Sequence, residues 1–280
     1  MDKDWVNWYC DKALDEDVGA GDHTSRACIP ENDTSEAYLL VKDSGVIAGV
    51  ELAEYIFENY ASHMSFTGHL KDGDEINHGD IAFEVSCNTR DLLKLERFIL
   101  NTMQRMSGIA SFSRRYANEV SDLPVKILDT RKTTPLLRYI EKWAVRIGGC
   151  ENYRFGLYDW IMIKDNHITA AGGVRNALEN VHRYLSDNKL DLDTTVEVRN
   201  QKELLRALDI GGFRRIMLDN FETAEMREAV ALIAGQYETE ASGGITLDNL
   251  REVAETGVDF ISSGALTHSY RSLDLSLKIK

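Results

Sequence analysis

A chain of 280 residues with 43% hydrophobic and 28% charged residues has an ordinary globular composition and is long enough for one large or two modest domains. Its formal net charge of −14 argues against nucleic acid as a partner. No apolar stretch approaches the roughly 18–20 residues that a membrane helix needs. Four scattered cysteines without CxxC pairing and the lack of signal-peptide features predict a cytoplasmic protein with free thiols.

The first third of the chain predicts a mixed α/β domain. In chain order we expect a helix over about residues 4–16, a polar Gly-containing stretch, β structure over 36–50, a helix near 51–62, short strands with DG and HG turns, and a helix over 91–118. A turn at Asp43–Gly45 should interrupt the β structure. In the last helix, Gly108 marks either a break or a point of close packing.

From residue 125 onward, short apolar strands alternate with helical stretches. The expected strands are VKILD (125–129), IMIK (161–164), TVEV (195–198), RIMLD (215–219), YETEAS (237–242) and DFISSG (259–264). The later strands begin about 20–23 residues apart, the length of one β/α unit. Repeated β/α units form a parallel sheet, and so many of them favour closure into a barrel. Because six strands are found rather than eight, we expect the barrel to be incomplete.

The charge is uneven along the chain. The segment from Arg131 to Arg175 contains eight Lys/Arg and four Asp/Glu, so it carries a net charge of +4 in an otherwise acidic protein. In DTRKTTPLLR (129–138) the like charges repel one another unless an anion is bound there. A solvated, salt-bridged helix face is the alternative interpretation. The basic segment nevertheless favours a pocket for a small, multiply charged anion.

Polar residues stand at the end of each expected strand. They are Asp129–Lys132, Lys164–Asn166, Glu197, Asp219–Asn220, Ser242–Gly244 and Ser263–Gly264. Barrel enzymes react at the C-terminal ends of their strands and commonly bind phosphate at the loops after the last ones. The two Gly-rich loops can offer backbone N–H groups to a phosphate. We therefore expect an active site at these strand ends.

The residue types indicate the chemistry of that site. Several cations, among them Arg131, Arg154 and Lys164, suit a substrate with more than one carboxylate or phosphate. Glu197 and Asp219 suit Mg²⁺ shared with a polyphosphate, or sugar hydroxyls, with structural ion pairing as the alternative. No serine or cysteine has a partner histidine, so we expect catalysis by positioning and electrostatics.

Several long segments resemble the quinolinate phosphoribosyltransferase family, the decarboxylating nicotinate-nucleotide pyrophosphorylases. They are ILDTRKTTPLLR, RFGLYDWIMIKDNHI, VEVRN, IMLDN, EASGGI and GVDFISSGALTH, with EDVGAGDHTS, LERFILNTMQRMSGIAS and LDLSLKI elsewhere. The resemblance implies transfer of a phosphoribosyl group from phosphoribosyl pyrophosphate to quinolinate, with Mg²⁺, in NAD biosynthesis. The products would be nicotinate mononucleotide, pyrophosphate and CO₂.

The resemblance also implies a fold and an assembly. The fold would be an N-terminal α/β sandwich-like domain (1–108), an incomplete parallel α/β barrel (109–268) and a C-terminal segment (269–280) that returns to the first domain. The assembly would be a homodimer with shared active sites, in which the N-terminal domain of one chain caps the barrel of the other. A higher oligomer is left open.

Site residues follow from the same match. Quinolinate would be bound by Thr130, Arg131, Tyr153, Arg154 and Lys164, together with the partner subunit's Arg97. Lys132, Ser242, Gly243, Gly244, Ser263 and Gly264 would bind phosphate. The catalytic residues would be Lys132, Lys164, Glu197 and Asp219, with Glu197 and Asp219 also holding Mg²⁺.

The chain departs from the family pattern at Tyr153, where a histidine is usual, and more mildly at Cys150, where a glycine is usual. A phenol with a pKa near 10 is neutral and offers one O–H, whereas a histidine can be cationic. We expect weaker quinolinate binding, by about 5–30-fold. Two alternatives stay open: a paralogue associated with molybdate transport that acts on a different anion, and a non-catalytic anion-binding homologue.

Overall fold

The chain divides into two compact units in a computed structural model that describes residues 1–280. Residues 1–112 and 271–280 form the first unit, and residues 113–270 form the second. The boundaries expected from the sequence, at residues 108 and 268, differ from these by a few residues. No helix combines the length and the apolar character that crossing a lipid bilayer requires.

A four-stranded antiparallel sheet forms the centre of the first unit. Its strands, in spatial order, are β12 (Leu275–Ile279), β1 (Thr34–Val41), β5 (Ile81–Asn88) and β3 (Ser65–Gly68). The short strands β2 (Gly45–Val46) and β4 (Glu75–Ile76) pair with each other. Along β1, Ala37, Leu39 and Val41 are buried at every second position, so one face of the sheet carries the core.

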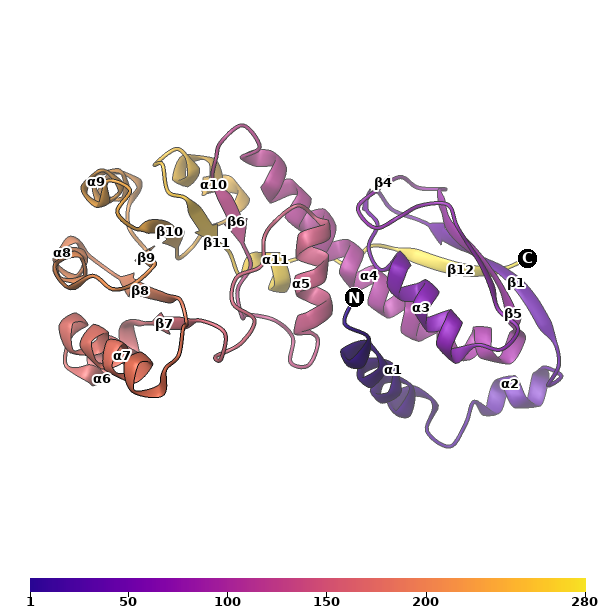
Figure 1. Ribbon diagram of the computed structural model, residues 1–280. Helices are drawn as coiled ribbons and strands as arrows, with labels where there is room; N and C mark the ends of the chain where they lie inside the picture. Colours follow the sequence, from indigo (N-terminus) through magenta and orange to yellow (C-terminus); the bar gives the residue numbers. More distant parts are fainter. The chain divides into compact units, whose positions relative to one another are not determined.

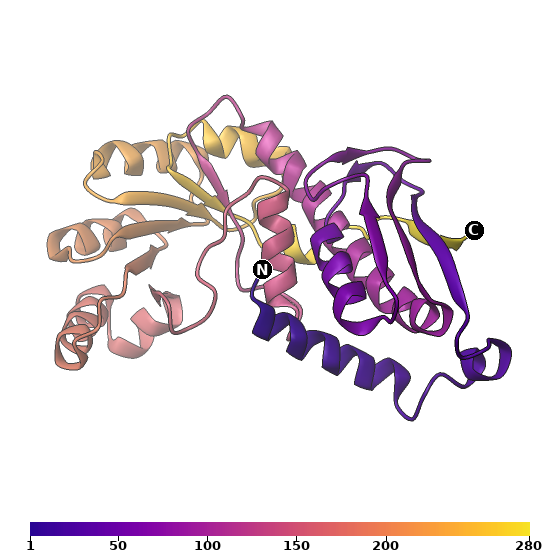
Figure 2. The ribbon, with the colours of Figure 1, turned by 45° about the vertical axis from the view of Figure 1, so that its right-hand side comes forward.

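Helices cover that apolar face (Figures 1 and 2). They are α3 (Val50–Tyr60) and the N-terminal part of α4 (Thr89–Glu119), with α1 (Lys3–Val18) and the short α2 (His23–Cys28) completing the unit. The rings of Phe57, Phe66 and Phe83 meet between helix and sheet, with centroids 4.7–6.4 Å apart. The expected helices are confirmed, whereas α2 was not expected. Its start is stabilised by Asp22, whose carboxylate accepts a hydrogen bond from the backbone N–H of Ser25 at 3.0 Å.

The second unit is a parallel β/α structure. Its six strands, in spatial order, are β6 (Lys126–Leu128), β11 (Phe260–Ser262), β10 (Glu238–Ser242), β9 (Arg215–Asp219), β8 (Thr194–Val198) and β7 (Ile161–Ile163). Every neighbouring pair is parallel, and β6 and β7 do not pair with each other. The incomplete barrel predicted from the six-strand pattern is therefore confirmed.

Helices follow the strands and lie outside the sheet (Figure 1). They are α5 (Arg138–Ile147), α6 (Asp165–Ala171), α7 (Val174–Asn188), α8 (Gln201–Ile210), α9 (Thr223–Ile233), α10 (Leu247–Ala254) and α11 (Ala265–His268). Residues of β8 are buried on both faces, as expected for a parallel strand between helices and a barrel interior. Because all six strands run in one direction, their C-terminal ends meet at one edge, where the expected site residues lie.

Gly108 does not break α4 but allows close packing in the first unit. A Cβ atom at this position would overlap the carbonyl oxygen of Arg271 and lie 3.0 Å from the Cα of Ser272, in the segment that leads to β12. The glycine therefore serves helix-to-backbone contact, at the expense of its low helix propensity.

We predict that Gly108→Ala lowers the free energy of unfolding by about 1–3 kcal/mol, although alanine is the better helix former. Urea unfolding of the purified protein measures this change. Gly68→Ala is the matched control, since a Cβ there meets its nearest atoms at 3.8 Å, in ordinary contact. Equal stability of the two variants would contradict the packing role of Gly108.

Candidate active site

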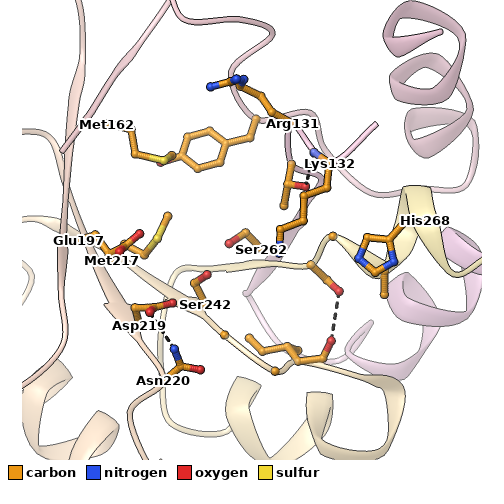
Figure 3. A pocket seen from close by; sticks show the side chains of 18 of the residues that line it. Arg131, Lys132, Met162, Glu197, Met217, Asp219, Asn220, Ser242, Ser262 and His268 are labelled. Carbon is orange, nitrogen blue, oxygen red and sulfur yellow. Dashed lines mark hydrogen bonds between the residues drawn. The ribbon is translucent and has the colours of Figure 1, made fainter. Parts of the chain in front are cut away.

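The C-terminal strand ends of the second unit enclose a cavity of about 790 Å³ (Figure 3). This volume is within the range of small-molecule sites. The predicted residues that line it are Thr130, Arg131, Lys132, Tyr153, Arg154, Lys164, Glu197, Asp219, Ser242, Gly243, Gly244, Ser263 and Gly264. Only Arg97 does not line it. Arg97 is exposed on α4 in the other unit, and its approach to a partner's site stays a prediction.

The guanidinium groups of Arg131 and Arg154 give one side of the cavity its charge. The Nε of Arg131 is buried without a hydrogen-bond partner, and Arg154 donates from Nη1 to the carbonyl oxygen of Trp160 at 3.1 Å. Partial burial and the nearby charge of Arg131 lower the pKa of Arg154 from its ordinary value. Two like charges held together with an unused donor form a site for an anionic group.

Carboxylates occupy another part of the cavity. Glu197, at the end of β8, forms an ion pair with Lys164, with 2.9 Å between Oε2 and Nζ. Asp219, at the end of β9, accepts a hydrogen bond from the side chain of Asn220 at 2.8 Å. Burial, and then the charge of Glu197, raise the pKa of Asp219. The two carboxylates are therefore close enough to repel each other.

These two carboxylates fit a Mg²⁺ ion that is shared with a substrate better than one that is held by protein side chains alone. No cluster of three or more acidic, histidine or cysteine side chains able to hold a metal exists in the chain. Mg²⁺ usually takes one or two carboxylates and completes its six oxygen ligands with water and substrate phosphates. Glu197 and Asp219 match that donor set.

The Gly-rich loops bring backbone close to the cavity. Gly243 has φ +95°, and a Cβ there would overlap the side-chain oxygen of Asn220. At Gly264 a Cβ would lie 2.7 Å from the Cδ of Lys132. Both donors of Ser263 are used within the protein. Its N–H donates to the carbonyl oxygen of Leu128 at 3.0 Å, and its hydroxyl donates to the carbonyl oxygen of Ile245 at 3.2 Å. Its donors thus hold the loops in place, which leaves phosphate contact to the adjoining glycines.

Tyr153 lines the cavity with its ring, but its hydroxyl is used within the protein. The oxygen lies 2.7 Å from Oγ1 of Thr195, at the second residue of β8. Burial, reinforced by the charge of Glu240, raises the pKa of Tyr153, so the phenol is neutral. The predicted role of Tyr153 in binding quinolinate, and the weaker binding expected from it, stay predictions.

Several residues of the cavity wall were not predicted from the sequence. Met162 and Met217 line it from β7 and β9, and His268 lines it from α11. The methionines lay within apolar strands and were indistinguishable from core residues. Each methionine stands two residues before a polar residue at a strand end, Lys164 or Asp219. This spacing places the methionine and the polar residue on the same face of the chain. His268 carried no motif, and its place beside Gly264 follows only from the fold.

Comparisons with known proteins agree with this geometry. Two family models match, the N-terminal domain of quinolinate phosphoribosyl transferase over residues 22–107 and the C-terminal domain over residues 109–278. A nicotinate-nucleotide pyrophosphorylase [carboxylating], chloroplastic, from Arabidopsis thaliana is 46% identical over 95% of this chain and 80% of its own length. A probable nicotinate-nucleotide pyrophosphorylase [carboxylating] from Bacillus subtilis is 41% identical over 94% of this chain and 90% of its own.

Solved structures give the same result. The crystal structure of NadC from Streptococcus pyogenes superposes with a TM-score of 0.92 at 36% identity and covers 100% of this chain and 99% of that one. The nicotinate-nucleotide pyrophosphorylase from Francisella tularensis has a TM-score of 0.92 at 33% identity, covering 100% and 98%.

Asp129 holds together the two segments that carry Arg131 and Arg154. Its carboxylate is fully buried and pairs with the ammonium group of Lys142 on α5. The same carboxylate accepts a hydrogen bond from the backbone N–H of Tyr153 at 2.8 Å. Burial raises the pKa of Asp129 to about 6 and lowers that of Lys142, so both charges depend on their pairing. One buried ion pair therefore positions both arginines of the cavity.

We predict that Asp129→Asn lowers the free energy of unfolding by about 3–5 kcal/mol, because it leaves the Lys142 ammonium buried without its counterion. Chemical denaturation measures the loss. Lys126→Met is the matched control: it breaks the Lys126–Glu151 pair, whose side chains are 54% and 50% exposed, and should cost about 0–1 kcal/mol. A cost for Asp129→Asn no larger than that of the control would contradict the role of the pair.

Proposed function

The chain belongs to the quinolinate phosphoribosyltransferase family, and from this premise we propose that it makes nicotinate mononucleotide from quinolinate and phosphoribosyl pyrophosphate, releasing pyrophosphate and CO₂. The reaction supplies NAD biosynthesis. The observation that carries the proposal is that one cavity contains two kinds of group. It holds two arginines, one of which has a buried donor without a partner, and two neighbouring carboxylates. This combination suits a dicarboxylate beside a metal-bound polyphosphate.

We propose that the two carboxylates of quinolinate bind to Arg131, Arg154 and Lys164, with Thr130 at the edge of the same group. Guanidinium groups bind carboxylates through two parallel hydrogen bonds, which fixes the plane of the pyridine ring as well as its place. Tyr153 would contribute its ring as a wall rather than its hydroxyl. Lys164 is shared, because its ammonium group also pairs with Glu197 and so joins the two parts of the site.

Phosphoribosyl pyrophosphate would lie along Lys132 and the Gly-rich loops. Gly243, Gly244 and Gly264 line the cavity, and their backbone N–H groups would donate to a phosphate there. Ser242 and Ser263 border the same loops, Ser263 as a support. Glu197 and Asp219 would hold Mg²⁺ together with oxygens of the substrate, and the bound ion would stabilise negative charge on the departing pyrophosphate.

The chemistry needs no protein nucleophile. The ring nitrogen of quinolinate forms a bond to the anomeric carbon of the ribose as the bond from that carbon to the pyrophosphate oxygen breaks. The bond to the 2-carboxylate then breaks, its electron pair stays on the ring carbon beside the cationic nitrogen, and a proton replaces CO₂. The residues contribute by holding both anions in reach of each other and by opposing the charge that develops.

The assembly and its location are part of the proposal. We propose a homodimer with shared active sites, in which the partner subunit's Arg97 adds a further cation to the quinolinate end. Exposure of Arg97 on α4 and the excess of cations already in the cavity are consistent with that role. A cytoplasmic location follows from the scattered free cysteines, all four of which are unpaired.

We predict that the protein releases CO₂ from carboxyl-labelled quinolinate only when phosphoribosyl pyrophosphate and Mg²⁺ are both present. Omitting the co-substrate and chelating the metal with EDTA are the two controls. Absence of release from a folded sample would contradict the proposed reaction. Thermal stabilisation by another pair of anions would then favour the molybdate-linked alternative, and stabilisation by at most one ligand would favour a non-catalytic protein.

We predict that Arg131→Met raises the KM for quinolinate by at least tenfold, because a charge-assisted hydrogen bond contributes about 1.5–3 kcal/mol. The KM for phosphoribosyl pyrophosphate should change little. Arg146→Met on α5 is the matched control, since that arginine is exposed and does not line the cavity. Steady-state kinetics with each substrate varied in turn measures both constants, and equal changes in the two would argue against the assignment of Arg131.

A further inference from the structure

A second layer of side chains lies beneath the residues that line the cavity. On strands β8 to β11 the cavity is lined by Glu197, Met217, Ser242 and Ser262. The residues two positions earlier on the same strands are Thr195, Arg215, Glu240 and Phe260. Side chains alternate between the faces of a strand, so these four point into the barrel directly below the cavity. The supporting layer therefore contains two charged groups.

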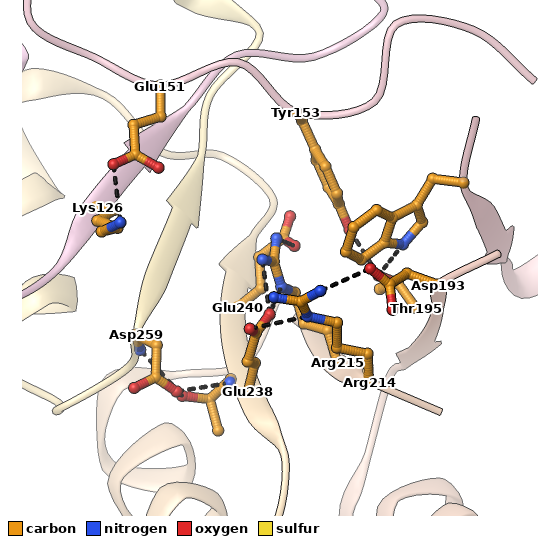
Figure 4. A network of polar contacts seen from close by, with 12 residues as sticks. Lys126, Glu151, Tyr153, Asp193, Thr195, Arg214, Arg215, Glu238, Glu240 and Asp259 are labelled. Carbon is orange, nitrogen blue, oxygen red and sulfur yellow. Dashed lines mark hydrogen bonds and ion pairs between the residues drawn. The ribbon is translucent and has the colours of Figure 1, made fainter. Parts of the chain in front are cut away.

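Arg215 and Glu240 form an ion pair in the barrel interior (Figure 4). Their side chains are 6% and 0% exposed, and Nη1 of Arg215 lies 3.2 Å from Oε2 of Glu240. The other carboxylate oxygen of Glu240 is buried without a hydrogen-bond partner. Arg215 also donates to Glu238 at 2.9 and 2.7 Å. A charge pair at this depth needs close geometry to offset the loss of hydration.

The guanidinium group is enclosed by aromatic rings. It lies 3.7 Å from the ring centroid of Phe260, 5.1 Å from that of Tyr153 and 5.4 Å from that of Trp160. All three are distances at which a cation is attracted to a ring face. The rings of Tyr153 and Trp160 meet edge to face at 5.8 Å, and both residues reach the hydroxyl of Thr195, at 2.7 and 2.9 Å. Arg215 thus supports the one ring that also forms the cavity wall.

The position of Tyr153 decides the position of Arg154, which follows it directly in the chain. Arg154 donates to the carbonyl oxygen of Trp160, so both ends of its local framework, Tyr153 and Trp160, rest on the Arg215 guanidinium. Arg215 itself does not line the cavity. A displacement of the Arg215 guanidinium group would therefore move Tyr153 and Arg154, at the quinolinate end of the site.

We infer that Arg215 and Glu240 are positioning residues that act through Tyr153 to place Arg154 for quinolinate. The inference rests on the proposed function, because it assigns the carboxylate-binding end of that site its support. It also accounts for the tyrosine at position 153. Thr195 and Arg215 contact this side chain from the barrel interior, and the next residue, Arg154, supplies a positive charge at the cavity wall.

The test uses the double variant Arg215→Met/Glu240→Leu in the full-length protein. Replacing both members avoids leaving one charge buried alone, and apolar residues of similar size often substitute for a buried ion pair without loss of stability. Glu238 keeps Arg214 as its partner, at 3.0 Å. We expect the KM for quinolinate to rise about tenfold and the KM for phosphoribosyl pyrophosphate to stay within about twofold, since misplacement of a binding group acts on its own ligand.

Two further variants isolate the route through Tyr153. Arg175→Met is the matched control, because it removes an arginine that is 58% exposed, pairs with Glu179 and Asp209 and does not line the cavity, and it should leave both constants unchanged. In a Tyr153→Leu background, the double variant should add a smaller increase in the KM for quinolinate, because only the contact of Arg215 with Trp160 is then left to lose. Circular dichroism and urea unfolding confirm that each variant is folded.

Each outcome bears on the inference. A selective rise in the KM for quinolinate that becomes smaller in the Tyr153→Leu background supports it. An unchanged KM, a parallel change in both constants, or the same increase with and without Tyr153 overturns it, and so does a double variant that cannot fold. A wild-type protein that releases no CO₂ refutes the proposed function instead, and the inference falls with it, whereas an active wild type with unaffected variants refutes the inference alone.

Discussion

The buried ion pair between Asp129 and Lys142 is the interaction on which the active site depends. Two segments distant in the chain must meet for the arginines to share one cavity: the loop after β6, and the segment that spans the opening between β6 and β7. Asp129 begins the first and accepts a hydrogen bond from the backbone of Tyr153 in the second. Since Lys142 comes from α5, one carboxylate joins a helix to both segments. The ion pair adds to an isolated backbone bridge between Leu128 and Glu151, because β6 and β7 do not pair with each other here.

The electrostatics of the cavity follows from its arrangement within an acidic protein. A net charge of −14 would repel anionic substrates if it were spread evenly. Several cations are instead concentrated in one cavity, where Lys164 pairs with Glu197. Partial burial, and then the charge of Arg131, lower the pKa of Arg154. A bound dianion would offset both effects.

Much of this could be predicted from the sequence, and the limits have physical reasons. The six strands and the polar residues at their ends could be predicted because short strand-like runs and β/α spacing are local properties of the sequence. The support by Arg215 and Glu240 could not, because the two residues are 25 positions apart in the chain and only the register of β9 and β10 brings them together. The hydrogen bond between Tyr153 and Thr195 could not be predicted for the same reason, because Thr195 is distant in the chain. The short helix α2 was missed because its capping residue lay within a Gly-containing stretch.

Alternation along the strands connects these two results. Because side chains two positions apart on a strand point to the same face, each of the strands β8 to β11 contributes at least one residue to the cavity and, two positions earlier, one to the layer below it. The site therefore depends on two sets of residues: those that line the cavity, and those in the layer below, against which the lining residues pack. A large neutral ring at position 153 needs a partner beneath it that a smaller or charged side chain would not, and Arg215 meets that need by stacking against the ring while neutralising Glu240. Substitutions at position 153 and in the supporting layer should thus be energetically coupled, even though only the first reaches the cavity.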